Sequence, residues 1–401
     1  MEKKEMKTLG IYVHIPFCVS KCHYCDFLSF RANEAEKKRY ISALAGEITR
    51  WGKLCKKTGG NYSVSTIYFG GGTPSVLEAI YIEEILQTIK QNFDVEEAAE
   101  ITLECNPGTA DSEKFSSYYK MGINRISMGL QSAHNQELQK IGRIHTWEEF
   151  LQSYGAARKA GFSNISLDVM SALPDQTYEM YRDTLRKAVN LKPEHISSYS
   201  LIIEEGTPFY DMYKQNLFRL PDEETERKMY YYTGEFLKQK GYHRYEISNY
   251  AREGYESRHN SSYWTGKNYL GFGLGASSLI NHIRFRNTDD MKQYIGRNSD
   301  NNSDYTNIEE LLSGYREVEV LSIKAQMEEF MFLGLRMMRG ISKAYFEELY
   351  GKNFDKVYGK VCEKLEKEGF IICEGDNVRL TERGIDVSNC VLAEFLLESD
   401  A

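Results

Sequence analysis

Six short β-rich segments alternate with five helical segments over the first half of this chain, and that alternation limits its fold more than any other feature. Apolar residues recur at three- and four-residue spacing in the helical segments. Because each return of a chain to the same strand direction needs a crossover, the pattern predicts a parallel sheet with helical connections. We expect an α/β fold built on an open, partial (β/α)6 barrel. The expected strands are 10–15, 66–70, 101–105, 125–129, 165–170 and 195–201, and the expected helices are 35–49, 77–91, 112–121, 147–160 and 178–191.

Motifs with cysteine, glycine or polar residues follow five of the expected strands. The carboxyl ends of parallel strands meet at one rim of such a sheet, so we expect these motifs to form a single site. Taken alone, each has a structural explanation: a tight turn for the glycines, a surface carboxylate for Glu104 and a helix N-cap for Asp168. The motifs are Cys18 to Cys25, Gly70-Gly71-Gly72-Thr73-Pro74, Glu104-Cys105-Asn106-Pro107, Gln131 and Asp168.

The first of these motifs is a CxxxCxxC formed by Cys18, Cys22 and Cys25. Three thiolates at this spacing can hold three irons of a cubane [4Fe-4S] cluster and leave the fourth iron open to a chelating ligand. A zinc site is the alternative, with His14 or His23 as its fourth ligand. The other five of the eight cysteines are scattered, which is typical of buried apolar residues rather than of a disulfide framework.

The alternation of strands and helices is lost from about residue 221 onward. A helix-like segment at 223–240 precedes the segment 242–247, and a region rich in glycine and aromatic residues follows at 259–279. The polar segment 298–304 is a candidate linker or loop tip. A small winged-helix-like domain is then predicted from three helices and a hairpin. The helices are expected at 326–338, 343–350 and 354–368, and the hairpin pairs 370–373 with 378–380. We therefore expect a partial barrel at 1–220, an α+β extension at 221–310 and the winged-helix-like domain at 311–401.

Charge and hydropathy exclude several partner classes. The net charge is −8 and the helix 358–368 has no basic stripe, so we expect no nucleic-acid partner. No apolar stretch reaches the roughly 20 residues that a membrane-spanning helix needs, and no apolar signal-peptide core follows the charged N-terminus. A cytoplasmic location, where thiols stay reduced, is the expectation.

The ordered set of motifs resembles the oxygen-independent coproporphyrinogen oxidase family of radical S-adenosylmethionine (SAM) proteins. The resemblance covers nearly all of the chain and rests on Tyr12-Val13-His14-Ile15-Pro16-Phe17-Cys18, the cysteine triplet, the Gly-Gly-Gly-Thr-Pro and Glu-x-Asn-Pro motifs, Ser127-Met128-Gly129-Leu130-Gln131-Ser132 and Leu167-Asp168.

This resemblance implies a [4Fe-4S] cluster on Cys18, Cys22 and Cys25, with SAM on its open iron and an electron donor as a partner. Glycine lets the backbone approach a ligand closely, and buried charges of SAM need partners. The SAM contacts that the resemblance implies are backbone approach at Gly71 and Gly72, the Thr73 hydroxyl, Glu104 on the amino group, Arg143 on the carboxylate, Asp168 on the ribose, Gln131 as a further polar contact, and Tyr24 and Tyr12 at the adenine.

Two features separate this chain from the decarboxylating enzyme of that family. Phe27 stands where that enzyme has a further cysteine, and only eleven residues precede Tyr12 where it has a long N-terminal extension. Both favour the haem-chaperone branch, which carries an HNxxYW motif, present here as His259 to Trp264. The resemblance implies His259 as the haem ligand, since imidazole is a common axial ligand of haem iron. A histidine hydrogen-bonded within a loop is the alternative.

The chain also departs from the family pattern. Ala172 and Asp175 replace the glycines of a Gly-Leu-Pro-Gly-Gln motif, where positive φ is expected to require glycine, and Ser277 stands where a histidine often occurs. The last change removes a second candidate haem ligand.

Three functions follow as hypotheses. The favoured one is a haem chaperone that passes haem to an acceptor such as a respiratory protein, acting as a monomer or weak homodimer. The second is an oxygen-independent coproporphyrinogen III dehydrogenase, which removes two propionate carboxyl groups as carbon dioxide. The third is a radical SAM enzyme acting on RNA, which the acidic balance disfavours. Whether the chain is an enzyme stays open at this point.

Overall fold

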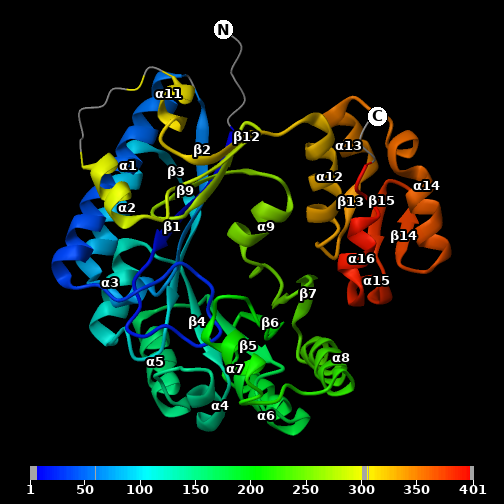
Figure 1. Ribbon diagram of the computed structural model, residues 1–401, viewed down its shortest axis with the longest axis horizontal. Helices are drawn as coiled ribbons and strands as arrows, with labels where there is room; N and C mark the ends of the chain where they lie inside the picture. The colour runs from blue at the N-terminus through cyan, green and yellow to red at the C-terminus, as the bar shows by residue number, and fades with distance from the viewer. Residues whose placement is uncertain (1–6, 59, 300–304, 306, 398–401) are drawn as a thin grey trace.

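The computed structural model describes residues 7–58, 60–299, 305 and 307–397. Its centre is a run of six parallel strands in the order β1-β2-β3-β4-β5-β6, and the run is not closed into a full barrel. Helices cover the outside of this curved sheet (Figure 1). The predicted open α/β barrel is confirmed. The strands are β1 (Lys7–Ile15), β2 (Tyr62–Gly71), β3 (Asp94–Cys105), β4 (Arg125–Gln131), β5 (Ile165–Ser171) and β6 (His195–Ser200).

The helices between these strands begin and end at residues that suit helix termini. Asn33 and Thr146 form capping boxes with Glu36 and Glu149, and glycines in the left-handed conformation end α3 and α5. The helices are α1 (Glu34–Lys57), η1 (Pro74–Val76), α2 (Ala79–Asn92), α3 (Ser112–Met121), α4 (Asn135–Lys140), α5 (Trp147–Ala160), α6 (Tyr178–Asn190), α7 (Pro208–Lys214) and α8 (Glu223–Gln239).

The sheet continues past both edges of the six-stranded run, which the sequence does not predict. β9 (Asn268–Phe272) pairs in parallel with β1, and Leu270 and Phe272 join the core of the barrel. The extension at 221–310 therefore shares one sheet and one core with the barrel, while the expected boundaries stay predictions. The other added strands are β10 (Ser277–Ile280), β11 (Ile283–Arg286) and β12 (Arg316–Val320) beyond β9, and β8 (Asn249–Ala251) and β7 (His243–Glu246) beyond β6.

Helix α9 (Arg258–Trp264) lies between the central sheet and the C-terminal part of the chain (Figure 1). It is followed by the short helices α10 (Met291–Asn298) and α11 (Ile308–Leu312). The expected linker at 298–304 falls mainly on residues 300–304, which lie outside the described residues.

The C-terminal part has its own hydrophobic core and a three-stranded antiparallel sheet in the order β13-β15-β14. Helices packed on a small sheet of this kind confirm the predicted winged-helix-like domain. Its elements are α12 (Ile323–Gly334), β13 (Ile341–Ser342), α13 (Lys343–Tyr350), α14 (Phe354–Lys367), β14 (Ile371–Glu374), β15 (Asn377–Leu380), α15 (Glu382–Asp386) and α16 (Ser388–Ala393). Among the helices of the described ranges, none combines the length and the apolar character that crossing a membrane needs.

Candidate cluster and cofactor site

The cysteine motif lies on the loop between β1 and α1. The backbone N–H of Cys18 donates to Phe30 O (3.0 Å), and the N–H of His23 donates to Ile141 O (3.1 Å). These bonds tie the loop to the barrel at two points and leave all three cysteines free and partly exposed. Burial raises the pKa of the Cys25 thiol to about 11, so this side chain stays protonated at neutral pH unless a metal cation favours its thiolate.

Three free thiols on one loop are donors that suit an iron–sulfur cluster. Within the described ranges, no three histidine, cysteine or acidic side chains are gathered closely enough to hold a metal ion. The His14 ring, considered above as a zinc ligand, is already engaged at both nitrogens: Nδ1 with the Tyr12 hydroxyl (3.1 Å) and Nε2 with Leu28 O (2.9 Å). The donor set fits the cluster better than a zinc site completed by His14.

Two of the sulfur atoms contact residues from other strand ends. Cys18 Sγ lies 3.4 Å from the Thr73 hydroxyl, and Cys22 Sγ lies 3.8 Å from Arg143 Nη1. Asn106 connects these two neighbours, because its Nδ2 donates to Thr73 Oγ1 and its Oδ1 accepts from Arg143 Nη2, each at 2.8 Å. The structure thus brings motifs after β1, β2 and β3 together with Arg143 at one rim. Asn106 has no role in the sequence-based prediction, although it belongs to the Glu-x-Asn-Pro motif.

Glu104 is half-buried at the end of β3. Its Oε1 accepts from the Tyr68 hydroxyl (2.7 Å) and its Oε2 accepts from the N–H of Gly71 (3.2 Å). Burial raises the pKa of this carboxyl to about 7 despite both bonds. A ligand ammonium at this position would supply the missing opposite charge, which is the chemistry that the predicted role requires.

Gly71 has a φ of +108°, and a Cβ there would lie 2.4 Å from the His14 ring. The neighbouring Gly72 leaves equally little room, because a Cβ would lie 2.8 Å from Ile15 O. Backbone at this turn therefore lies against β1 in a way that only glycine permits.

We expect Gly71→Ala to lower the free energy of unfolding by about 2 kcal/mol or more, because a left-handed backbone and a clash with an anchored ring are combined. Urea unfolding measures this change. Gly155→Ala is the matched control: Gly155 lies inside helix α5 with open space around its added Cβ, so alanine is expected to be neutral or stabilising. Equal destabilisation of both variants would contradict the steric explanation.

The remaining predicted SAM residues line the same rim. Arg143 Nη2 also donates to Gly129 O (2.8 Å), and Gln131 Oε1 accepts from the Tyr199 hydroxyl (3.2 Å). Burial raises the pKa of Asp168 on β5. Tyr24 packs on an apolar cluster beside the cysteine loop. Their individual contacts with SAM stay predictions.

Ala172 and Asp175 both adopt a φ of +57°, the left-handed conformation that glycine adopts most easily. The turn keeps its shape because Asp175 is held from both sides. Its carboxylate lies 2.7 Å from Lys140 Nζ, and its N–H donates to Arg219 O (2.8 Å). These two contacts anchor Asp175 in a conformation that glycine adopts at lower cost.

His259 lies on α9 and is 1% exposed. Its Nδ1 bonds the Thr66 hydroxyl (2.9 Å), its Nε2 bonds the Tyr263 hydroxyl (2.8 Å), and its ring stacks on Tyr68 with centroids 5.1 Å apart. Burial lowers its pKa to about 3, so the imidazole is neutral at physiological pH. Tyr68 also bonds Glu104, so a single side chain separates the histidine of the HNxxYW motif from the predicted SAM site.

Sequence reasoning missed Arg125 at the start of β4. This side chain is 1% exposed, and its Nε and Nη1 have no hydrogen-bond partner in the described part of the chain. Its charge lowers the pKa of both Glu104 and Asp168, against the larger effect of burial. The available signal was a charged residue opening a strand in which every residue is buried.

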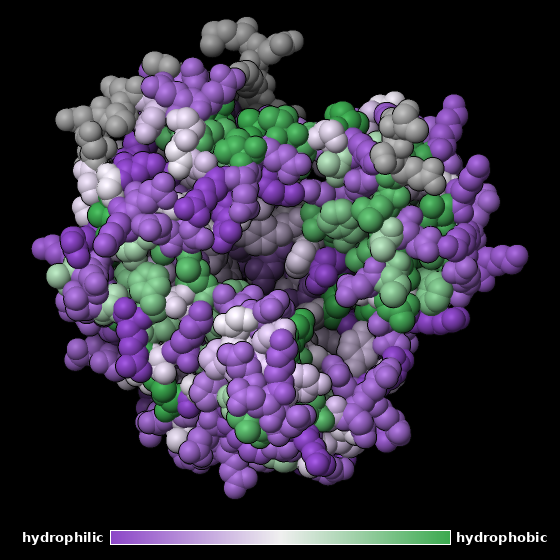
Figure 2. Space-filling view, viewed as in Figure 1, coloured by the Kyte–Doolittle hydropathy of each residue, from purple (hydrophilic) through white to green (hydrophobic). Residues whose placement is uncertain are grey.

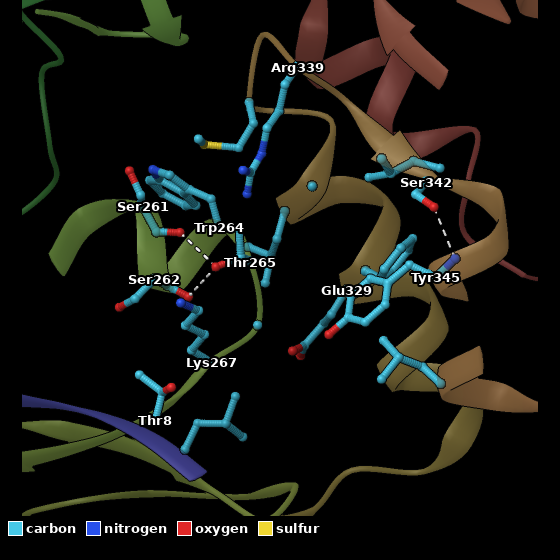
Figure 3. Close-up of a pocket in the computed structure, with 18 of the residues that line it drawn as sticks. Thr8, Ser261, Ser262, Trp264, Thr265, Lys267, Glu329, Arg339, Ser342 and Tyr345 are labelled. Atoms are coloured by element: carbon cyan, nitrogen blue, oxygen red, sulfur yellow. Dashed lines mark hydrogen bonds between the residues drawn. The ribbon is translucent and has the colours of Figure 1, made fainter. Parts of the chain in front are cut away.

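A large cavity lies away from the cysteine loop. It has a volume of about 1070 Å³ and opens between α9 and the C-terminal domain, where Figure 2 shows a hollow in the surface. Ser261, Ser262 and Trp264 of the HNxxYW motif line one side, and residues of α12 and α13 line the other (Figure 3).

Comparisons with known proteins agree with this architecture. Residues 12–188 match the radical SAM superfamily, and residues 321–387 match the HemN C-terminal domain. The Escherichia coli coproporphyrinogen III oxidase HemN has the same fold, with a TM-score of 0.82 and 22% identity over 98% of this chain and 90% of that one.

Several curated relatives carry the name heme chaperone HemW. The Lactococcus lactis protein is 37% identical over 98% of each chain, and the Bacillus subtilis protein is 36% identical over 96% of this chain and 99% of its own. The Escherichia coli protein is 31% identical over 98% of this chain and 100% of its own. With such identity over nearly the whole of both sequences, this chain belongs to the HemW family of radical SAM proteins.

Proposed function

We propose that this protein is a haem chaperone, which binds haem together with a SAM-ligated [4Fe-4S] cluster and passes the haem to an acceptor protein. The observation that carries the proposal is the similarity to proteins named heme chaperones along nearly the full length of both chains. The acceptor, an electron donor for the cluster, the cytoplasmic location and a monomeric or weakly dimeric state belong to the same proposal.

The proposed cofactor residues are those gathered at the rim. When bound, the cluster and SAM supply one-electron chemistry, and the chain's own residues position them. Cys18, Cys22 and Cys25 would hold the cluster. The proposed SAM residues are Tyr12, Tyr24, Gly71, Gly72, Thr73, Glu104, Gln131, Arg143 and Asp168.

His259 is the proposed axial ligand of the haem iron. A neutral imidazole is the form that binds iron, and burial keeps this ring neutral. Iron ligation through Nε2 would replace the bond to Tyr263, while Nδ1 would keep its bond to Thr66. A second hydrogen bond of this kind commonly orients a metal-binding histidine.

We expect His259→Ala to weaken haem binding by more than about tenfold, since it removes the iron ligand itself. The test is an anaerobic haem titration of the cluster-reconstituted protein, followed by absorbance. His195→Ala is the matched control, because His195 is equally buried and is bonded at both ring nitrogens, by Ser166 and Tyr245. If both variants lose haem alike, the loss reflects folding rather than ligation.

A coproporphyrinogen III assay on the same sample separates the chaperone from the decarboxylating enzyme. The fold shared with HemN permits either function, because that likeness at 22% identity shows the fold alone. We expect stoichiometric haem binding and no decarboxylation. Decarboxylation without a haem complex would overturn the proposal and make the protein a porphyrinogen oxidase.

A further inference from the structure

We propose that the cavity between α9 and the C-terminal domain binds the carboxylates of haem through Lys267 and Arg339. This inference rests on the proposed function and adds to it a binding site for the haem carboxylates, separate from the ligand of the haem iron. Its ligand class is a large planar molecule with an apolar body and negatively charged carboxylates.

The size and the walls of the cavity suit such a ligand. At about 1070 Å³ it lies at the upper end of the range found for small-molecule sites. The wall formed by α12 and α13 is largely apolar and includes Phe330 and Leu333, and Tyr345 and Leu349 on this wall are each 48% exposed. Exposed aromatic and aliphatic side chains that face a cavity provide a surface for an apolar ring system.

The acidic side chains on the cavity wall already have partners. Glu329 forms a bidentate pair with Arg284 at 2.7 and 2.9 Å, and Glu256 pairs with His243 at 2.6 Å. Glu96 accepts from the Ser63 hydroxyl and lies 3.8 Å from Arg258. Each of these three carboxylates therefore has a polar or charged partner within the protein.

Lys267 and Arg339, unlike the acidic side chains of the cavity wall, have side chains without a partner in the described part of the chain. Both line the cavity, from the segments that follow α9 and α12, and neither side chain has a hydrogen bond or an ion pair in the described part of the chain. Arg339 extends toward Trp264 in Figure 3. Two cations without counter-charges at one cavity favour an anionic ligand, and carboxylates are the anions that haem carries.

Trp264 supplies an independent observation on the same wall. Its indole Nε1 is buried and has no acceptor among the described residues, while Arg336 lies 4.4 Å from the ring centroid. The Trp264 ring thus adds aromatic surface, packed against a cationic side chain, to the wall of the cavity.

The predicted iron ligand His259 does not itself line the cavity but contacts its wall. Thr66 lines the cavity, and its hydroxyl bonds Nδ1 of His259. The histidine therefore lies directly behind the cavity wall, and carboxylate binding by Lys267 and Arg339 on the near side is a separate contact from iron ligation. The two contributions can be measured independently.

The test compares haem with haem dimethyl ester, whose carboxylates are uncharged, in the cluster-reconstituted full-length protein. We expect the wild type to bind haem about tenfold more tightly than the ester, which is the combined effect of two partly exposed ion pairs. The double variant Lys267→Gln with Arg339→Gln should bind haem about tenfold more weakly and should no longer distinguish it from the ester. Lys360→Gln, which changes an exposed lysine on α14 outside this cavity, is the control and should behave as the wild type.

A double variant that binds haem as tightly as the wild type, or that keeps the preference for haem over the ester, would overturn the inference and leave the proposed function intact. Absence of haem binding by the wild type would overturn the proposed function, and this inference with it. The two failures are therefore distinguishable in one set of titrations.

Discussion

Replacing any one of Cys18, Cys22 and Cys25 by alanine is expected to abolish assembly of the [4Fe-4S] cluster. Each thiolate would hold one iron of the cubane, and in this structure no other cysteine lies on the same loop to replace it. Iron and sulfide content after anaerobic reconstitution measures the effect, together with the loss of the cluster absorbance. We expect near-complete loss in all three variants.

Cys55→Ala is the matched control for these variants. Cys55 is buried near the C-terminal end of α1 and does not belong to the cysteine loop, so we expect it to take no part in cluster binding. This variant should keep a full iron complement. A zinc content that follows Cys18, Cys22 and Cys25, in place of iron and sulfide, would support the zinc alternative and refute the cluster.

Glu104→Gln is expected to weaken SAM binding by about a hundredfold, about 3 kcal/mol, because it leaves the ligand ammonium without its counter-charge in a buried site. Equilibrium dialysis with the reconstituted protein measures this. Glu97→Gln is the control, since Glu97 is an exposed carboxylate on the same strand. Unchanged SAM affinity in Glu104→Gln would remove the assigned role.

The same variant should change how stability depends on pH. The folded-state pKa of Glu104, about 7, lies above its ordinary value of 4.5, so the folded protein binds this proton more tightly than the unfolded chain does. The resulting contribution to the free energy of unfolding is fully present below pH 4.5 and is lost as the pH rises through 7. The free energy of unfolding of Glu104→Gln minus that of the wild type, measured without SAM, should therefore increase by up to about 3 kcal/mol between pH 4.5 and pH 8. Denaturant unfolding at the two pH values tests the sign; an unchanged difference would mean that the carboxyl is not desolvated as described.

The six central strands and the rim could be predicted because their signals are local. Each strand is a short apolar run between helices, and Gly71 and Glu104 lie at the ends of such runs, whereas Asp168 lies in the middle of β5 and not at its expected end. Parallel topology then brings their ends together without any knowledge of contacts.

The parts that could not be predicted depend on pairing between distant segments. The strands β7 to β12 are three to five residues long and are defined by their neighbours rather than by a periodic pattern. The surroundings of His259 in the HNxxYW motif could not be predicted for the same reason. The partners of this histidine, Thr66 and Tyr68, lie almost 200 residues earlier in the chain, so its burial beside the predicted SAM site cannot be seen in the sequence.

The pairing of β1 with β9 has a consequence for biosynthesis. β1 is among the first segments to leave the ribosome, but one of its two edges is covered only when residues 268–272 have been made. Until then the nascent barrel carries an unpaired, largely apolar edge, which is a template for wrong strand pairing. A polypeptide released at residue 220 would keep that edge permanently, so productive folding of the N-terminal half depends on translation reaching the segment beyond α9.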